Sequence, residues 1–191
     1  MFSTALTFLL TTVFNLLTLL FLLRFFLQLF KAPFNNPLTY MVTSLTDFAV
    51  KPARRVIPSW GKIDLSTLIL ALLTQFILQF SLLWLRDLPL SLVGNTVWIS
   101  LIGMSLLGVF RTALDVFFYA ILLQVILSWV NPQSPISNVL NSLTKPILAP
   151  IQRILPVANG MDFSPIVALI LIQMINVSVV RSLEQQLLSL Y

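Results

Sequence analysis

The sequence predicts an all-α membrane protein with four transmembrane helices, built from a duplicated unit of helix, amphipathic loop and helix. Three observations support this prediction: an apolar composition, several segments long enough to cross a bilayer, and an internal repeat. Of the 191 residues, 58% are hydrophobic and only 9% are charged. A soluble domain carries about 25% charged residues, so lipid must be the solvent for most of this chain.

The composition also excludes most kinds of catalytic centre. The chain contains neither cysteine nor histidine. Disulfides and thiolate nucleophiles are therefore excluded, and the commonest general base and metal ligand are missing. We expect no enzyme activity, no cofactor and no metal site. The net charge of +5 does not indicate nucleic-acid binding, because the basic residues lie between apolar segments, where they set topology and contact anionic lipid.

Apolar segments long enough to cross a bilayer set the number of spans, since the hydrocarbon core needs about 20 helical residues. Residues 5–30, 65–85 and 164–180 each meet this length. The stretch 88–130 is ambiguous because it holds very few charges over a length that fits one span with extra apolar chain, or two spans.

An internal repeat helps to decide between these alternatives. When the sequence is shifted by 98 residues, 37–77 aligns on 135–175 without gaps, and twelve of the 41 pairs are identical. Shared leucines mean little in so apolar a chain, but polar residues and prolines are rare or costly in membranes. The most informative identical pairs are Pro37 with Pro135, Pro52 with Pro150, Arg55 with Arg153, Pro58 with Pro156, Asp64 with Asp162, and Gln75 with Gln173.

A duplicated unit most simply keeps its orientation, so an even number of crossings separates the two loops. A shift of 100 residues maps the first helix onto roughly residues 105–130. Five spans, with the loops on opposite faces, remain the alternative. The predicted first repeat (1–87) has spans at about 5–30 and 64–85, the predicted second repeat (105–191) has spans at about 105–130 and 163–183, and residues 88–104 form an interfacial or re-entrant connector or extend the third helix.

The distribution of basic residues predicts the orientation. Seven basic residues in the two loops, against three on the other side, place the loops in the cytoplasm and both termini outside. Arg24 is expected to snorkel into the cytoplasmic interface from one to two turns inside its span. The seven are Lys31, Lys51, Arg54, Arg55, Lys62, Lys145 and Arg153, and the three are Arg86, Arg111 and Arg181.

The two loops, 37–58 and 135–156, carry apolar residues at three- and four-residue spacing. This spacing predicts amphipathic helices that lie in the headgroup plane. Internal prolines are expected to kink or divide them. Their basic residues either bind acidic lipid or an acidic partner, or only anchor the loops and set topology. The binding candidates are Lys51, Arg54, Arg55, Lys145 and Arg153, and the prolines inside the loops are Pro52, Pro146 and Pro150.

Two aspartates, Asp64 and Asp162, stand just before apolar helices. An aspartate at this position accepts backbone N–H bonds and favours the positive end of the helix dipole, so we expect a capping role. An ion pair with one of the loop arginines is the second interpretation. A proton or ion relay is the third, and the absence of histidine argues against it.

A few polar residues fall within the spans. Gln75 and Gln173 occupy equivalent positions of the repeat, which indicates interhelical hydrogen bonds contributing about 1 kcal/mol or less, or a polar pathway. Arg111 and Asp115 lie four residues apart and are expected to pair on one helix face.

The loops and helix starts resemble the YggT family. The resemblance covers nearly the whole chain. In that family the second loop usually carries two arginines before Ile-Leu-Pro, whereas this chain has Gln152 at the first position, which leaves Arg153 as the better candidate. The matching segments are 36–38, 51–58 (Lys-Pro-Ala-Arg-Arg-Val-Ile-Pro), 61–66, 127–129, 134–136, 144–156 and 160–166.

The resemblance implies a small multi-pass protein of the bacterial inner membrane. Family members are associated with osmotic or ion-stress tolerance, with cell division and envelope shape, and with thylakoid assembly in plastids. Most polar identities of the repeat lie in the loops or at helix starts, which favours a non-enzymatic scaffold or assembly factor that contacts anionic lipid headgroups and an unidentified membrane protein. A transport or ion-homeostasis component, acting as a homo-oligomer, is the alternative, because four spans hardly enclose a pore alone. An enzyme acting on lipids lacks suitable residues.

Overall fold

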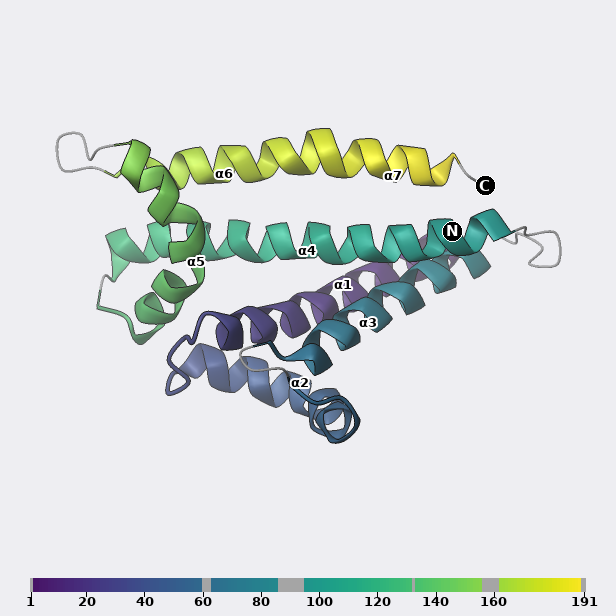
Figure 1. The fold of residues 1–191 in the computed structure, drawn as a ribbon, viewed down its shortest axis with the longest axis horizontal. Helices are drawn as coiled ribbons and strands as arrows, with labels where there is room; N and C mark the ends of the chain where they lie inside the picture. Colours follow the sequence, from purple (N-terminus) through teal and green to yellow (C-terminus); the bar gives the residue numbers. More distant parts are fainter. Residues whose placement is uncertain (1, 60–62, 86–94, 132, 156–161, 190–191) are drawn as a thin grey trace.

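The computed structural model describes residues 2–59, 63–85, 95–131, 133–155 and 162–189. Within these ranges every secondary-structure element is a helix. Figure 1 shows long helices running side by side, with α2 and α5 at the end of the bundle opposite to the two termini. The elements are α1 (Phe2–Leu29), α2 (Pro37–Val56), α3 (Leu65–Trp84), α4 (Asn95–Val130), α5 (Pro135–Ile154), α6 (Ser164–Ile175), a π-helical turn (Asn176–Val180) and α7 (Arg181–Leu188).

Four helical segments are long and apolar enough to cross a bilayer. The helix is the natural choice for such segments, because it satisfies every backbone polar group within the segment itself. This finding confirms the predicted fold class of an all-α membrane protein with four spans. The segments are Ser3–Leu29, Leu65–Trp84, Thr96–Val130 and Ser164–Leu188.

The third span begins earlier than the sequence predicted. Helix α4 starts at Asn95, so residues 95–104 continue this helix, and of the expected connector only 88–94 lies outside the described residues. Tertiary packing explains the extension, because Val97 and Leu101 form a buried cluster with Leu83 at the end of α3. At 1.5 Å per residue, the 36 residues of α4 extend about 54 Å, well beyond a core of about 30 Å.

The fourth span also runs further than predicted, to Leu188 instead of about 183. The π-helical turn joins α6 to α7 without interrupting the helical rod (Figure 1). Contacts with α4 hold the end of this rod, since the Ser100 hydroxyl donates to the carbonyl oxygen of Leu187 at 2.8 Å.

Helices α2 and α5 begin in the same way. Each has a proline in its first turn, Pro37 or Pro135, where the missing N–H group breaks no hydrogen bond. The side chain of Asn36 caps α2 by accepting from the Thr39 N–H at 2.9 Å, and Ser134 accepts from the N–H of Ile136. These caps explain why both helices start at the equivalent residue of each repeat.

The prolines inside α2 and α5 bend these helices without dividing them. Pro52 lies within α2, and Pro146 and Pro150 lie within α5, yet each helix continues past them (Figure 1). Each proline removes one backbone donor, which produces a bend. Pro58 follows the end of α2, whereas Pro156 lies outside the described residues.

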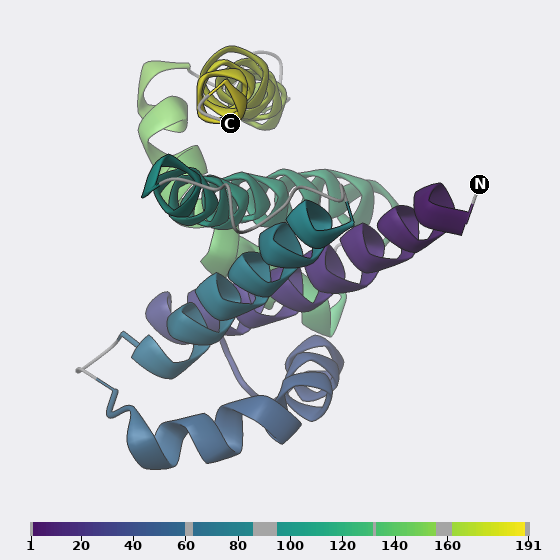
Figure 2. The ribbon, with the colours of Figure 1, turned by 90° about the vertical axis from the view of Figure 1, so that its right-hand side faces the viewer.

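Helix α4 is the centre of the bundle. Seen from the end in Figure 2, it lies between the pair α1–α3 on one side and the rod α6–α7 on the other. One apolar cluster joins α1, α3 and α4 through Phe21, Ala71 and Val109. A second joins α4, α5 and α6 through Ile121 and Ala168, among others. The two repeats are therefore packed on each other mainly through α4.

Candidate functional site

The candidate binding residues lie on α2 and α5, at one end of the bundle. These two helices contact each other through their first halves, where Val42 of α2 joins a buried cluster with Val139 and Leu143 of α5. Their last turns, which carry Arg55 and Arg153, point away from this contact (Figure 1 and Figure 2). The structure thus presents two separate basic helix ends instead of one basic patch.

The neighbouring arginines of α2 have different environments. Arg54 forms an ion pair with Asp64 at the start of α3, through its Nε at 3.1 Å and also through Nη2, and it donates to Gln28 of α1 at 2.9 Å. Arg55 is exposed and contacts no described acceptor or carboxylate. Arg54 therefore fastens the end of α2 to the bundle, while Arg55 faces outward.

The predicted capping role of Asp64 is wrong, and the ion-pair interpretation holds instead. Its side chain makes no hydrogen bond to the first turn of α3 and is completely buried against Arg54. One carboxylate oxygen, Oδ1, accepts no hydrogen bond from the described residues. The Thr67 hydroxyl bonds the backbone carbonyl of Asp64 at 2.9 Å, and this hydrogen bond helps to stabilise the helix start. A carboxylate this deeply buried needs its cationic partner.

The second repeat replaces this ion pair with a neutral donor. Gln152, the repeat counterpart of Arg54, donates to Oδ2 of Asp162 at 2.8 Å. The backbone N–H of Ser164 donates to Oδ1 of the same aspartate at 2.8 Å, which is the predicted helix-start contact. Partial burial alone would raise the pKa of Asp162, but the hydrogen bonds from Ser164 and Gln152 outweigh it and hold that pKa below its ordinary value. Arg153 stays exposed, as Arg55 does.

A partly buried ion pair that the sequence analysis missed connects α1 to α2. Arg24 is 7% exposed and is paired with α2 within the protein, while its snorkelling into the cytoplasmic interface stays a prediction. Its Nη1 donates to Asp47 Oδ1 at 2.8 Å and to the Thr46 hydroxyl at 2.7 Å. The Lys51 ammonium and the Arg24 guanidinium beside Asp47 hold the pKa of that carboxyl below its ordinary value. The available signal was that Asp47 is the one acidic residue of 37–58 and precedes Lys51 by four.

The second repeat again has a neutral counterpart. Gln124, which corresponds to Arg24, donates to the Asn141 side chain at 2.7 Å and accepts from the Thr144 hydroxyl. Thr144 is the counterpart of Thr46, so the same two helices are joined at the same position of each repeat. The position of Asp47 is taken by Lys145, which is exposed.

The two intramembrane glutamines have different surroundings. Gln75 is 1% exposed, and its side-chain nitrogen donates to Asn15 at 2.9 Å and to Thr18 at 3.2 Å, which joins α3 to α1. Gln173 is exposed and makes no hydrogen bond to the described part of the chain. Helix α6 packs through Ala168 and Ile172, and this rotation turns Gln173 outward.

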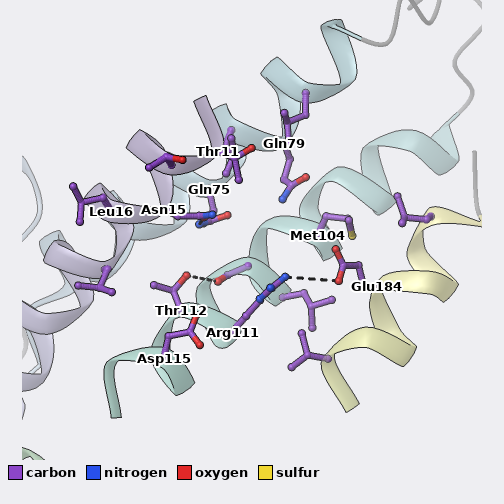
Figure 3. A pocket seen from close by; sticks show the side chains of 18 of the residues that line it. Thr11, Asn15, Leu16, Gln75, Gln79, Met104, Arg111, Thr112, Asp115 and Glu184 are labelled. Carbon is purple, nitrogen blue, oxygen red and sulfur yellow. Dashed lines mark hydrogen bonds and ion pairs between the residues drawn. The ribbon is translucent and has the colours of Figure 1, made fainter. Parts of the chain in front are cut away.

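A second polar region, shown in Figure 3, contains no residue of α2 or α5. It is a cavity of about 620 Å³ bordered by α1, α3, α4 and α7. The predicted pair of Arg111 with Asp115 does not form, because Arg111 points instead to Glu184, at 3.9 Å. In the described ranges no three histidine, cysteine, aspartate or glutamate residues lie close enough to hold a metal ion.

Comparison with known proteins identifies the family. The model of the family described as CCB3/YggT matches residues 3–85 and 103–183, so each match contains two spans and one of the helices α2 and α5. "Uncharacterized protein PA0392" of Pseudomonas aeruginosa is 38% identical over 183 residues, which cover 95% of this chain and 91% of that protein.

Two further bacterial relatives support the match. "Uncharacterized protein YggT" of Escherichia coli K12 is 38% identical over 94% of this chain and 91% of its own length. "Uncharacterized protein in proC 3'region" of Vibrio alginolyticus is 34% identical over 90% of this chain and 91% of its own. No solved structure matches the chain. The duplicated arrangement of spans and the two-part family match lead to one conclusion: the chain belongs to the CCB3/YggT family.

Proposed function

We propose that this protein is a non-enzymatic scaffold or assembly factor of the bacterial inner membrane, which uses the basic ends of α2 and α5 at the cytoplasmic surface. One observation carries the proposal. Arg55 and Arg153 are identical in the repeat and exposed, although the positions just before them, Arg54 and Gln152, are engaged with buried or capping aspartates. In each repeat, a side chain that is bonded to an aspartate, Arg54 or Gln152, lies next to an exposed arginine. This arrangement fixes the position of the helix end and leaves the neighbouring arginine available for binding.

The exposed apolar side chains of α2 support a location in the headgroup plane. Met41, Leu45 and Phe48 are 50–69% exposed, while Val42 and Val50 on the other side are buried against the bundle. Such side chains insert into the outer part of the acyl region when a helix lies at the interface. The arginines at the helix end then stand at the level of the lipid phosphates, where their planar guanidinium groups bind phosphate or carboxylate oxygens.

Buried contacts stabilise this arrangement. The ion pair of Arg24 with Asp47 fixes the middle of α2 to α1, and that of Arg54 with Asp64 fixes its end to α3. At the end of α5 the hydrogen bond from Gln152 to Asp162 takes this place. An anionic lipid or an acidic segment of another membrane protein therefore meets two basic helix ends, each joined to the bundle beside its exposed arginine. Envelope maintenance, cell division and osmotic-stress tolerance are the processes in which we expect such a scaffold to act.

The proposal is tested by measuring lipid association in nanodiscs with spin-labelled phosphatidylglycerol and electron paramagnetic resonance. We expect the double variant Arg55→Gln and Arg153→Gln to lose association with phosphatidylglycerol, by about fivefold for each arginine, since one basic residue contributes about 1 kcal/mol near an anionic surface. Arg181→Gln is the matched control, because it removes an exposed arginine from the opposite part of the chain. An equal loss in the control, or none in the double variant, contradicts the proposal.

A transport or ion-homeostasis component is the second candidate, and Gln75 is the residue that favours it. Gln75 borders the polar cavity, as a wet pathway requires. Gln173, its repeat counterpart, does not line that cavity and faces outward, so a path through both glutamines needs a second copy of the chain. Ion flux into proteoliposomes that falls on Gln75→Leu, but is unchanged by the arginine substitutions, would favour transport over the scaffold.

A further inference from the structure

The polar cavity of Figure 3 is lined by charged side chains from α4 and α7. Arg111 and Asp115 lie one turn apart on α4, and Glu184 faces them from α7. The closest approach of Arg111 to Glu184 is 3.9 Å, too long for a hydrogen bond, and 54% of the Arg111 side chain is exposed. Asp115 makes neither a hydrogen bond nor an ion pair with the described residues. Both signs of charge are therefore available to a ligand.

Arg111 and Asp115 lie inside the third span, whereas Glu184 lies near the end of the fourth, Ser164–Leu188. Gly108 of α4 lies against the side chain of Gln75, and Arg111 follows one turn later. Ionisable residues inside a span are costly and face a polar or water-filled space. Arg111 and Glu184 pair only at 3.9 Å, and Asp115 pairs with no described residue, so the site has room for the charges of a ligand.

The hydroxyl groups of the cavity limit what that ligand is. The Thr12 hydroxyl donates its hydrogen to the carbonyl of Phe8 at 2.8 Å, and the Thr112 hydroxyl donates to that of Gly108 at 2.8 Å. Their remaining lone pairs only accept. Together with the carboxylate of Asp115, they suit a group rich in N–H donors, such as a primary ammonium. Arg111 suits a phosphate.

The shape of the cavity points to a ligand that comes from the bilayer. Its walls on α1 and α7 do not contact each other anywhere in the described ranges, so the space between them is a groove over α4. Leucines border the polar floor on both walls, among them Leu16 and Leu19 of α1 and Leu188 of α7. A polar floor with apolar edges matches a lipid headgroup and the first part of its chains.

We propose that this groove binds the headgroup of a zwitterionic phospholipid, with its phosphate on Arg111 and its ammonium on Asp115. Phosphoethanolamine carries a phosphate and a primary ammonium two carbons apart. Arg111 and Asp115 are spaced one helical turn along α4, about 6 Å, which such a headgroup can bridge. Glu184 orients the guanidinium from the other wall. This site is separate from the basic ends of α2 and α5, where the expected lipid is anionic.

Spin-labelled phosphatidylethanolamine and phosphatidylglycerol, compared in nanodiscs containing the full chain, test the proposal. We expect a preference for phosphatidylethanolamine in the motionally restricted fraction, lost about tenfold in Asp115→Asn because one charge-assisted contact is removed. Arg111→Gln should weaken retention of both lipids at this site, whereas Arg111→Lys should retain part of it. Asp115→Asn keeps the side-chain size, and thermal melting verifies that all the variants are folded.

The double variant of Arg55 and Arg153 is the matched control, because it alters phosphatidylglycerol association and should leave the phosphatidylethanolamine preference unchanged. Equal retention of the two lipids by the unaltered protein overturns the proposal. So does a preference that persists in folded Asp115→Asn. The two sites are tested with different lipids. A negative result for the groove is therefore distinguishable from a negative result for the proposed scaffold function.

Discussion

The two repeats place their helices alike but join them with different chemistry. In the first repeat, ion pairs connect Arg24 to Asp47 and Arg54 to Asp64. In the second, Gln124 bonds Thr144 at the first of these positions, and Gln152 bonds Asp162 at the second. One set of helix contacts therefore tolerates either charged or neutral partners.

The difference shows that partners change together. Where Arg24 becomes Gln124, its partner Asp47 becomes Lys145, which turns outward. A buried arginine facing a lysine would be strongly unfavourable, so we expect one replacement without the other to destabilise the fold. Where the partner remains an aspartate, as at Asp162, only the donor changes. The comparison thus separates positions that hold the fold from those that stay exposed in both repeats.

The largest expected effect comes from introducing only one of the two exchanged residues of the second repeat into the first. Asp47→Lys places a cation against buried Arg24, and we expect the free energy of unfolding to fall by about 3–5 kcal/mol, the range for breaking a buried ion pair. Thermal and SDS-induced unfolding in detergent measure this. The control substitution Lys145→Ala changes the equivalent, exposed position of the second repeat, and it should change stability by no more than about 0.5 kcal/mol.

The adjacent arginines provide the next test. Arg54→Ala leaves the fully buried carboxylate of Asp64 without its cation, and we expect a loss of about 3 kcal/mol. Arg55→Ala removes the same side chain one residue later, from an exposed position, and should leave unfolding within about 0.5 kcal/mol of the original protein. Similar losses in the two variants would mean that the distinction between a structural and an exposed arginine is wrong.

A smaller difference is expected between the glutamines. Gln75→Leu removes hydrogen bonds to Asn15 and Thr18, and we expect a loss of about 0.6–1.7 kcal/mol, as for interhelical bonds in other membrane proteins. Gln173→Leu should be neutral or slightly stabilising, because it replaces an exposed amide on a lipid-facing helix. SDS-induced unfolding compares the two variants. A larger loss of stability for Gln173→Leu would indicate that a second copy of the chain packs on α6.

Acid should act most weakly, through Asp47 in the first repeat and Asp162 in the second. Because the pKa of Asp47 is lower in the folded protein than its ordinary value of 3.8, its contribution to stability is present above that value. The contribution is lost as the pH falls through the lower, folded-state pKa. Asp47→Asn should remove this part of the acid dependence. Unfolding curves from about pH 5 down to about pH 2 would show it as a smaller slope for the variant.

Much of the fold was predictable because its signals are local. Apolar length together with the internal repeat predicts four spans, and prolines at 37 and 135 after capping residues mark the starts of α2 and α5. The sequence left residues 88–104 as either a connector or an extension of the third helix, because the start of α4 at Asn95 depends on Val97 and Leu101 packing against α3. Periodicity within one segment carries no information about such tertiary contacts.

The site was less predictable for the same reason. Charge and repeat identity selected Arg55 and Arg153 but could not distinguish Arg54, whose role depends on Asp64 ten residues away being buried. Asp47 was overlooked because it has no identical counterpart in the repeat. The exchange at this position, from aspartate to lysine, becomes meaningful only when Arg24 and Gln124 are seen at the same place in each repeat.

The central claim is that the two repeats hold α2 and α5 by interchangeable contacts, and a double substitution tests it most directly. Arg24→Gln together with Asp47→Lys converts the first repeat to the chemistry of the second. We predict that the double variant recovers most of the unfolding free energy lost in Asp47→Lys alone, because the glutamine amide introduced by the first substitution would bond Thr46 as Gln124 bonds Thr144. A double variant no more stable than Asp47→Lys would contradict the claim.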